Sequence, residues 1–300
     1  MSYTRVKSAS SVYSASEGYA FFRIFTTRFL RPTAIRCIAS IFYNFFLRQF
    51  HAAWLPGRIP VSRVDHPLDQ KIPFTPSWVK VYLDFSAFWI RMMSFLLRKY
   101  GRRSFPAVRE FMESMNRLYV FAAGIYSKNL STTSRPFYIR RPHFFFIHLL
   151  DPHLMCVPSL HVLVVIWTYI RFAAIIRSFG DEQRHRDQIE EMKQGALAIT
   201  EAILFVKQHS VNCIPASLHA MTCFSPENFS PKEAEAFADL LFDAPLPASY
   251  AVPKTRLAGP EAAEIKAHII SLYRSFQEEG KIANSPEEPL LRFMKGLRDN

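Results

Sequence analysis

Six charge-poor apolar segments recur along the first three quarters of the chain. They span residues 35–47, 78–97, 118–127, 154–170, 196–206 and 211–224. A helix that crosses a bilayer needs about 20 predominantly apolar residues, and these segments approach that length, although several are shorter. The pattern predicts an all-α fold in which about six transmembrane helices form a bundle. The alternative is a soluble all-helical protein with unusually aromatic core helices, since 28 of the 300 residues are Phe.

The C-terminal residues have a different pattern, typical of soluble helices. Ser230 and Glu233 have the spacing of a capping box, with Pro231 at the first helical position. Residues 260–280 predict a second, amphipathic helix. Its apolar face carries Ile265, Ile269, Leu272 and Phe276. Residues 285–288 repeat the capping signature, so we expect a small helical tail on the cytoplasmic side, and we find no chemistry in it.

Charge is distributed unevenly along the chain. Residues 1–150 hold 22 basic and 6 acidic side chains, whereas residues 151–300 hold 15 basic and 19 acidic ones. The net charge of +12 suggests nucleic-acid binding, but the basic residues flank the apolar segments and do not form a patch on a polar face. Their concentration in segments 1–33, 98–110 and 177–194 is what the positive-inside rule requires of cytoplasmic loops.

These patterns predict an integral protein of the cytoplasmic (inner) membrane with no nucleic-acid partner. They divide the chain into a basic N-terminal segment (1–33), a transmembrane domain (34–225) and a soluble helical tail (226–300). A soluble helical protein that binds nucleic acid through residues 1–150 is a third possibility. The oligomeric state is left open.

The sequence lacks the motifs of several common enzyme classes. Only 9 residues are Gly, and neither GxGxxG nor GxxxxGK[ST] occurs, which disfavours dinucleotide and P-loop folds. The four cysteines show no CxxC spacing, and no HExxH is present, so no metal site is indicated. We expect no metal and no organic cofactor.

Three segments combine cationic or imidazole groups with short polar turns. They are 128–136 (KNLSTTSRP), 158–161 (PSLH) and 207–213 (KQHSVNC). The charge-based topology places all three at the extracytoplasmic ends of predicted spans. Lysine and arginine neutralise phosphate oxygens, and a pair of histidines can divide nucleophilic and acid catalysis. This composition favours phosphoryl transfer without a metal.

These segments resemble the motifs of the type 2 phosphatidic acid phosphatase superfamily, which comprises membrane lipid phosphatases and phosphotransferases. The first motif, Lys-x6-Arg-Pro, is matched by Lys128, Arg135 and Pro136. The second, Pro-Ser-Gly-His, is matched at Ser159 and His161, with the Leu160 variant of the inositol-phosphoceramide-synthase-like branch. The resemblance covers roughly residues 34–225.

The resemblance implies a role for each matched residue. His209 would attack phosphorus and form a phosphohistidine, while His161 would act as the general acid. Lys128, Arg135 and Ser159 would bind the phosphate. The implied substrate is a lipid phosphate or an isoprenyl diphosphate, within a membrane of other lipids. Which lipid it is, and whether the phosphoryl group passes to water or to an acceptor alcohol, are left open.

The third motif departs from the family pattern. Ala202 and Ile203 stand where Ser and Arg are usual, and Cys213 replaces the carboxylate that orients the nucleophile. Arg140 and Arg141 are the candidate substitutes for the lost guanidinium, beside Cys213 for the lost carboxylate. The alternative function is therefore a catalytically inactive relative that acts as a lipid-binding or membrane scaffold protein.

Other ionisable residues are given no catalytic role. His143, His148 and His153 recur every five residues, a period that fits neither a helix nor a strand. We expect them to be loop or interfacial residues. Glu201 lies inside a predicted span, where acids are commonly functional, and its partner cannot be named from the sequence.

Overall fold

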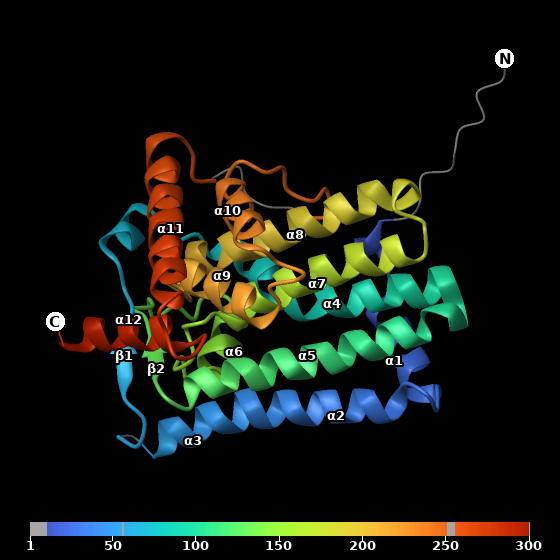
Figure 1. Cartoon of the computed structure of the whole chain (residues 1–300), viewed down its shortest axis with the longest axis horizontal. Helices are drawn as coiled ribbons and strands as arrows, with labels where there is room; N and C mark the ends of the chain where they lie inside the picture. The colour runs from blue at the N-terminus through green and yellow to red at the C-terminus, as the bar shows by residue number, and fades with distance from the viewer. Residues whose placement is uncertain (1–10, 56, 251–255, 300) are drawn as a thin grey trace.

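The structure is a computed structural model that describes residues 11–55, 57–250 and 256–299. Helices account for most of the described chain, which confirms the all-α prediction (Figure 1). The helices are α1 (Glu17–Thr26), α2 (Arg31–Ile41), α3 (Arg48–Trp54), α4 (Val79–Tyr100), α5 (Phe105–Tyr126), α6 (Pro142–Leu150), α7 (Leu160–Ser178), α8 (Arg186–Phe205), α9 (Cys213–Phe224), α10 (Pro231–Asp239), α11 (Gly259–Gly280) and α12 (Glu288–Asp299). Two short strands, β1 (Val61–Arg63) and β2 (Leu130–Thr132), and several short 3-10 and π-helical turns lie between these helices.

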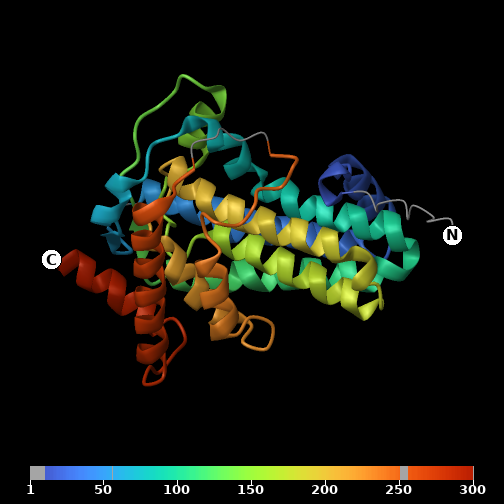
Figure 2. The same cartoon turned by 90° about the horizontal axis from the view of Figure 1, so that it is seen from above.

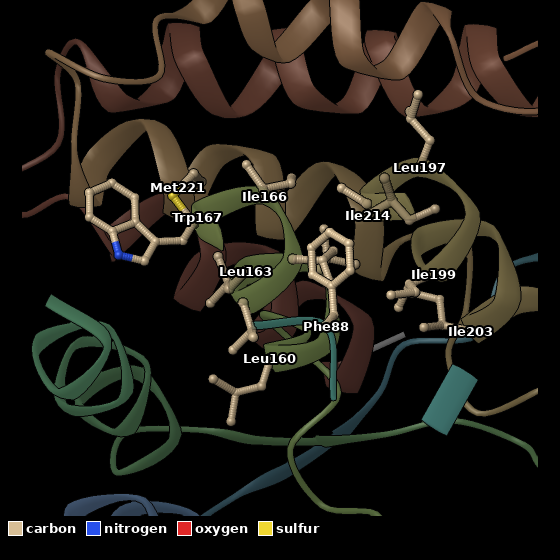
Figure 3. Close-up of a cluster of buried hydrophobic side chains, with 14 of the residues drawn as sticks. Phe88, Leu160, Leu163, Ile166, Trp167, Leu197, Ile199, Ile203, Ile214 and Met221 are labelled. Atoms are coloured by element: carbon tan, nitrogen blue, oxygen red, sulfur yellow. The ribbon is translucent and has the colours of Figure 1, made fainter. Parts of the chain in front are cut away.

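The core is built around α7, which packs against α4, α5, α8 and α9. Its residues 162–167 are all buried, so the helix has no solvent-facing side over this stretch. Figure 3 shows Leu163 and Ile166 of α7 among side chains of α4, α8 and α9. The one polar group of Trp167 is satisfied, because its Nε1–H donates to Ser114 Oγ at 2.9 Å.

Local signals set the helix boundaries as the sequence predicts. Ser230 and Glu233 form the reciprocal capping box at the start of α10. The amphipathic helix expected over residues 260–280 is α11, with Ile265, Ile269 and Phe276 buried. At the turn between α4 and α5, Gly101 adopts a φ of 54°, a left-handed conformation that glycine tolerates best.

The tail packs against α9 and the third motif that precedes it. His268 of α11 lies 2.8 Å from Asn212 Oδ1 at the start of α9, and Gln277 Nε2 donates to Thr222 Oγ1 near its end at 3.1 Å. Figures 1 and 2 both show α11 and α12 at one end of the bundle and α1 at the other. These contacts require the tail and residue 212 to lie on the same side of any bilayer.

Of the expected spans, one helix in the described chain is long and apolar enough to cross a membrane. This helix is α7, and 67% of its apolar window is buried against other helices. The core helix of a soluble protein can have the same length and apolar composition. α9 is apolar, but it has only 12 residues.

A continuous apolar face is exposed along the first helices. The chain is helical from Arg31 to Trp54, where a π-helical turn, Phe42–Leu47, joins α2 to α3. At about 1.5 Å per residue this run is roughly 36 Å long. Its outward apolar side chains are Ile35, Ile38, Phe42, Tyr43, Leu47 and Trp54, between 46% and 76% exposed. Figure 1 shows these helices along one edge of the bundle.

Candidate functional site

Strand pairing brings the first and second motifs together. β1 and β2 run parallel, and Ser131 of β2 forms an isolated bridge with Met155. The hydroxyl of Ser131 also accepts a hydrogen bond from the Val157 backbone N–H at 2.7 Å. The loop before α7 is therefore fixed beside the first motif, and the Ser159 N–H is bound by Ser217 Oγ of α9 at 2.7 Å.

The two predicted catalytic histidines lie side by side at this end of α7. The ring centroids of His161 and His209 are 5.6 Å apart, with the ring planes at 68°. His209 Nε2 is 3.4 Å from Ser159 Oγ. His161 is held between aromatic rings, stacked on Tyr82 at 4.4 Å and packed against Phe85 at 4.2 Å.

Arg135 reaches the same cluster from the end of the first motif. Its guanidinium donates to Gln208 Oε1 at 3.1 Å and to the Asp151 carbonyl oxygen at 2.9 Å. One guanidinium nitrogen is also 3.7 Å from the Asp151 carboxylate. The side chain is 17% exposed, so one largely buried cation is held beside Asp151 and beside Gln208, the residue that precedes His209.

The other expected phosphate-binding cations lie elsewhere. The Lys128 ammonium forms an ion pair with Glu287 of the tail, and its side chain is 51% exposed. Arg140 and Arg141 are exposed in the loop before α6, where Arg141 donates to the Pro76 carbonyl oxygen at 3.4 Å. Of the two cations in the first motif, the structure therefore brings only Arg135 to the histidines.

Two backbone hydrogen bonds hold Cys213 at the start of α9. Its N–H donates to the Ser210 carbonyl oxygen at 3.0 Å, and its carbonyl oxygen accepts from Ser217 Oγ at 2.6 Å. The thiol is fully buried. An orienting carboxylate would accept a hydrogen bond from His209 Nδ1. Among the described residues, this nitrogen has no partner of hydrogen-bond geometry.

Two residues that the sequence analysis did not select belong to this cluster. His153 lies in the loop between α6 and α7, as expected, whereas His143 and His148 lie in α6. The His153 side chain is 6% exposed, and its ring centroid is 6.4 Å from that of His209. Its Nε2 lies 2.8 Å from Thr133 Oγ1, and its backbone N–H donates to Asp151 Oδ1 at 2.8 Å. The available signal was an acid and an imidazole, Asp151 and His153, within ten residues of His161.

The backbone of His153 is unusual. Its φ is 63°, and Lys207 in the third motif has a φ of 54°. Non-glycine residues in the left-handed region cost free energy and cluster at functional sites, where surrounding contacts hold them in place. Here the Asp151 carboxylate holds the His153 N–H, and the Lys207 ammonium donates to the Asp69 carbonyl oxygen.

A small cavity of about 20 Å³ opens between these groups. Its polar lining comes from Gln49, Asp151, His153, His161 and His209, and its apolar lining from Phe45, Met155, Cys156 and Leu160. A cavity of this volume holds about one water molecule, which is less than a phosphate group needs. This cavity is therefore a site for water and does not admit a phosphate group.

Burial and neighbouring charges set the ionisation of the cluster. Burial raises the pKa of the Asp151 carboxyl, but the hydrogen bond and charge of His153, together with Arg135, outweigh burial and bring that pKa to about 2. Burial lowers the pKa of His209 well below its ordinary value, and the charges of His161 and His153 lower it further. At neutral pH the site therefore combines an ionised carboxylate with a neutral, potentially nucleophilic imidazole.

Glu201, whose partner the sequence could not supply, has a structural role. Its carboxylate is fully buried in α8 and accepts from the Arg256 guanidinium at 2.6 and 2.9 Å. The Phe242 N–H donates to the same carboxylate at 2.8 Å. These contacts attach the C-terminal segment to the bundle.

Within the described ranges, no three His, Cys, Asp or Glu residues are grouped so as to hold a metal ion.

Comparison of the chain with protein-family models, with curated proteins and with solved structures finds no match in any of the three. The evidence for function is therefore the site itself.

Proposed function

We propose that this protein is a membrane enzyme that hydrolyses or transfers the phosphoryl group of a lipid phosphate through a phosphohistidine. The observation that carries the proposal is that His161, His209 and Ser159 meet in one cluster, with Arg135 bound to Gln208 next to His209. These residues come from two sequence motifs and a third partial one, and only tertiary contacts bring them together.

The arrangement supports a two-step reaction. Neutral His209 attacks phosphorus through Nε2, so a P–N bond forms as the bond to the lipid oxygen breaks. His161 gives its proton to the departing oxygen, and the negative charge of a bound phosphate favours its protonated form. Arg135 and the Ser159 hydroxyl stabilise the charge on the phosphoryl oxygens. In the second step water or an alcohol gives a proton to His161 and attacks phosphorus, so a P–O bond forms as the P–N bond breaks and neutral His209 is released.

The exposed apolar face supports a place in a membrane. The helical run from Arg31 to Trp54 presents apolar side chains outward, with exposed Arg31 and Arg36 in its first two turns and exposed Arg58 four residues after its last residue. Cationic residues at both ends of an apolar face match the interfaces of a bilayer. We propose that this run and the long helices α4, α5, α7 and α8 form a polytopic membrane bundle.

The orientation in the membrane is a separate part of the proposal. Charge placement favours a site on the extracytoplasmic side of the cytoplasmic membrane. The contact between His268 and Asn212 requires α11 to be on the same side as the site. An extracytoplasmic site therefore moves the tail from the cytoplasmic side, where the sequence pattern placed it, to the extracytoplasmic side. Labelling a single cysteine at exposed Lys281 with an impermeant reagent, in intact cells, reports on which side this end of the bundle lies.

Phosphate release by purified protein tests the reaction. Phosphatidic acid and an isoprenyl diphosphate in mixed micelles are the substrates. His209→Ala should abolish release, whereas His143→Ala, a matched change at an exposed histidine, should leave it within about twofold. Turnover that persists in His209→Ala would remove that residue from its role. Trapping of ³²P on wild-type protein in acid-labile form identifies the phosphohistidine.

A non-catalytic lipid-binding protein is the second candidate. Two observations favour it: the cavity of about 20 Å³ is smaller than a phosphate group, and Lys128 is engaged by Glu287. This candidate predicts that the wild type binds vesicles containing phosphatidic acid without releasing phosphate, and that His209→Ala binds equally well.

A further inference from the structure

The cavity beside His209 is lined by polar atoms that other protein groups leave free. Gln49 is 1% exposed, and its Oε1 accepts from the Leu154 N–H at 3.1 Å, which fixes the orientation of the amide. Its Nε2 has no hydrogen-bond partner among the described residues. His209 Nδ1 is likewise buried without a partner of hydrogen-bond geometry among the described residues, and the Cys156 backbone also interacts with this imidazole. Both side chains line the same cavity.

Gln49 and His209 are uncharged, and Asp151 adds a carboxylate to the same cavity lining. One carboxylate oxygen accepts from the His153 N–H at 2.8 Å, and the other lies 3.7 Å from Arg135 and 3.8 Å from His153 Nδ1. The second oxygen therefore has ion-pair neighbours but no short hydrogen bond from them. The carboxylate lines the cavity together with Gln49 and His209.

We propose that Asp151 is the positioning carboxylate of this site and acts on His209 through one water molecule held by Gln49. The water accepts hydrogen bonds from Gln49 Nε2 and His209 Nδ1 and donates one to the Asp151 carboxylate. A buried water typically makes about three such bonds, and about 20 Å³ is room for one. The carboxylate that the third motif lacks at Cys213 is thus replaced from another part of the chain.

This arrangement fixes the tautomer of His209. A proton on Nδ1 leaves the lone pair on Nε2, the nitrogen 3.4 Å from Ser159 Oγ. That nitrogen is the one that would attack phosphorus, so the catalytic consequence rests on the proposed function. The tautomer itself does not, and it can be measured on protein without substrate.

Nitrogen NMR of the full chain labelled with ¹⁵N-histidine tests the inference directly. Two-bond ¹⁵N–¹H correlations distinguish a protonated ring nitrogen from an unprotonated one, and His209→Asn assigns the signal. We expect wild-type His209 to carry its proton on Nδ1. Asp151→Asn and Gln49→Met should each move a substantial fraction to the Nε2–H form. Gln183→Met, a matched change at an exposed glutamine, should not.

Kinetics provide a second readout that a purely structural role would not produce. Asp151→Asn and Gln49→Met should lower kcat by about 10²-fold with little change in KM, because the water orients the nucleophile and does not bind substrate. This loss is smaller than the roughly 10⁴-fold loss when a directly bonded carboxylate is removed.

Three outcomes decide the matter. An Nε2–H tautomer in the wild type overturns the inference, as does a tautomer unchanged in both variants. If the tautomer moves as expected but the wild type releases no phosphate, the inference stands and the proposed function fails. Circular dichroism shows whether Asp151→Asn is folded, and Gln49→Met tests the same water without touching the ion pair of Arg135.

Discussion

A buried ion pair offers a test of how the C-terminal segment is attached to the bundle. The Glu201 carboxylate is fully buried and receives two N–H donors from Arg256 and one from Phe242. The substitution Arg256→Met removes both guanidinium donors and keeps most of the apolar stem. It leaves a carboxylate in the core of α8 with one backbone partner.

The expected cost follows from this geometry. Removing one partner of a buried ion pair costs about 3–5 kcal/mol, because the remaining charge is uncompensated. The Arg256 side chain is 19% exposed, so water reaches its end and the lower figure of about 3 kcal/mol applies. For a protein of this size that corresponds to a fall in Tm of about 6 °C. The double variant Glu201→Gln/Arg256→Met also removes the charge and should recover at least about half of the loss.

Thermal unfolding followed by circular dichroism measures these differences. The matched control is Arg186→Met, since the Arg186–Asp187 pair is 4.0 Å long and its side chains are 81% and 86% exposed. That change should cost less than about 0.5 kcal/mol. If Arg256→Met lies within about 1 kcal/mol of the wild type, or if the double variant is no more stable than the single one, the reasoning about the buried charge is refuted.

Three other perturbations test the tail, the site and the core. Burial lowers the pKa of His268 to about 4, so the unfolded chain binds a proton first as the pH falls from 6.5. The contact of α11 should therefore weaken between pH 6.5 and 4. Hydrogen exchange in α11 should rise over this pH range, and it should rise less in His268→Gln. Arg135→Gln should lower phosphate release by about 10²-fold. Lys128→Gln should lower it by less than about threefold, because Lys128 is 51% exposed and pairs with Glu287. Equal losses of phosphate release in the two variants would contradict this difference. Leu163→Ala, at a fully buried position of α7, should cost about 2–5 kcal/mol in urea unfolding, and a cost below about 1 kcal/mol would contradict the packing.

The sequence by itself determined the features that depend on neighbours along the chain. The capping box at Ser230 and the buried stripe of α11 are both interactions between residues within a few positions of one another. Apolar stretches marked the helices that became α4, α5, α7 and α8, because a helix needs an apolar face to pack. The spacing of the motifs also selected His161, His209 and Arg135, which the structure brings together.

Tertiary structure alone decided which other groups join them. The period of His143, His148 and His153 carries no sign that one of the three is buried beside His209. That placement depends on the bridge between Ser131 and Met155, and Lys128 is drawn away by Glu287, 159 residues later in the chain. Contacts of this kind form because strands pair and helices pack across long separations. Their partners are fixed by shape and charge in space, which local periodicity does not encode.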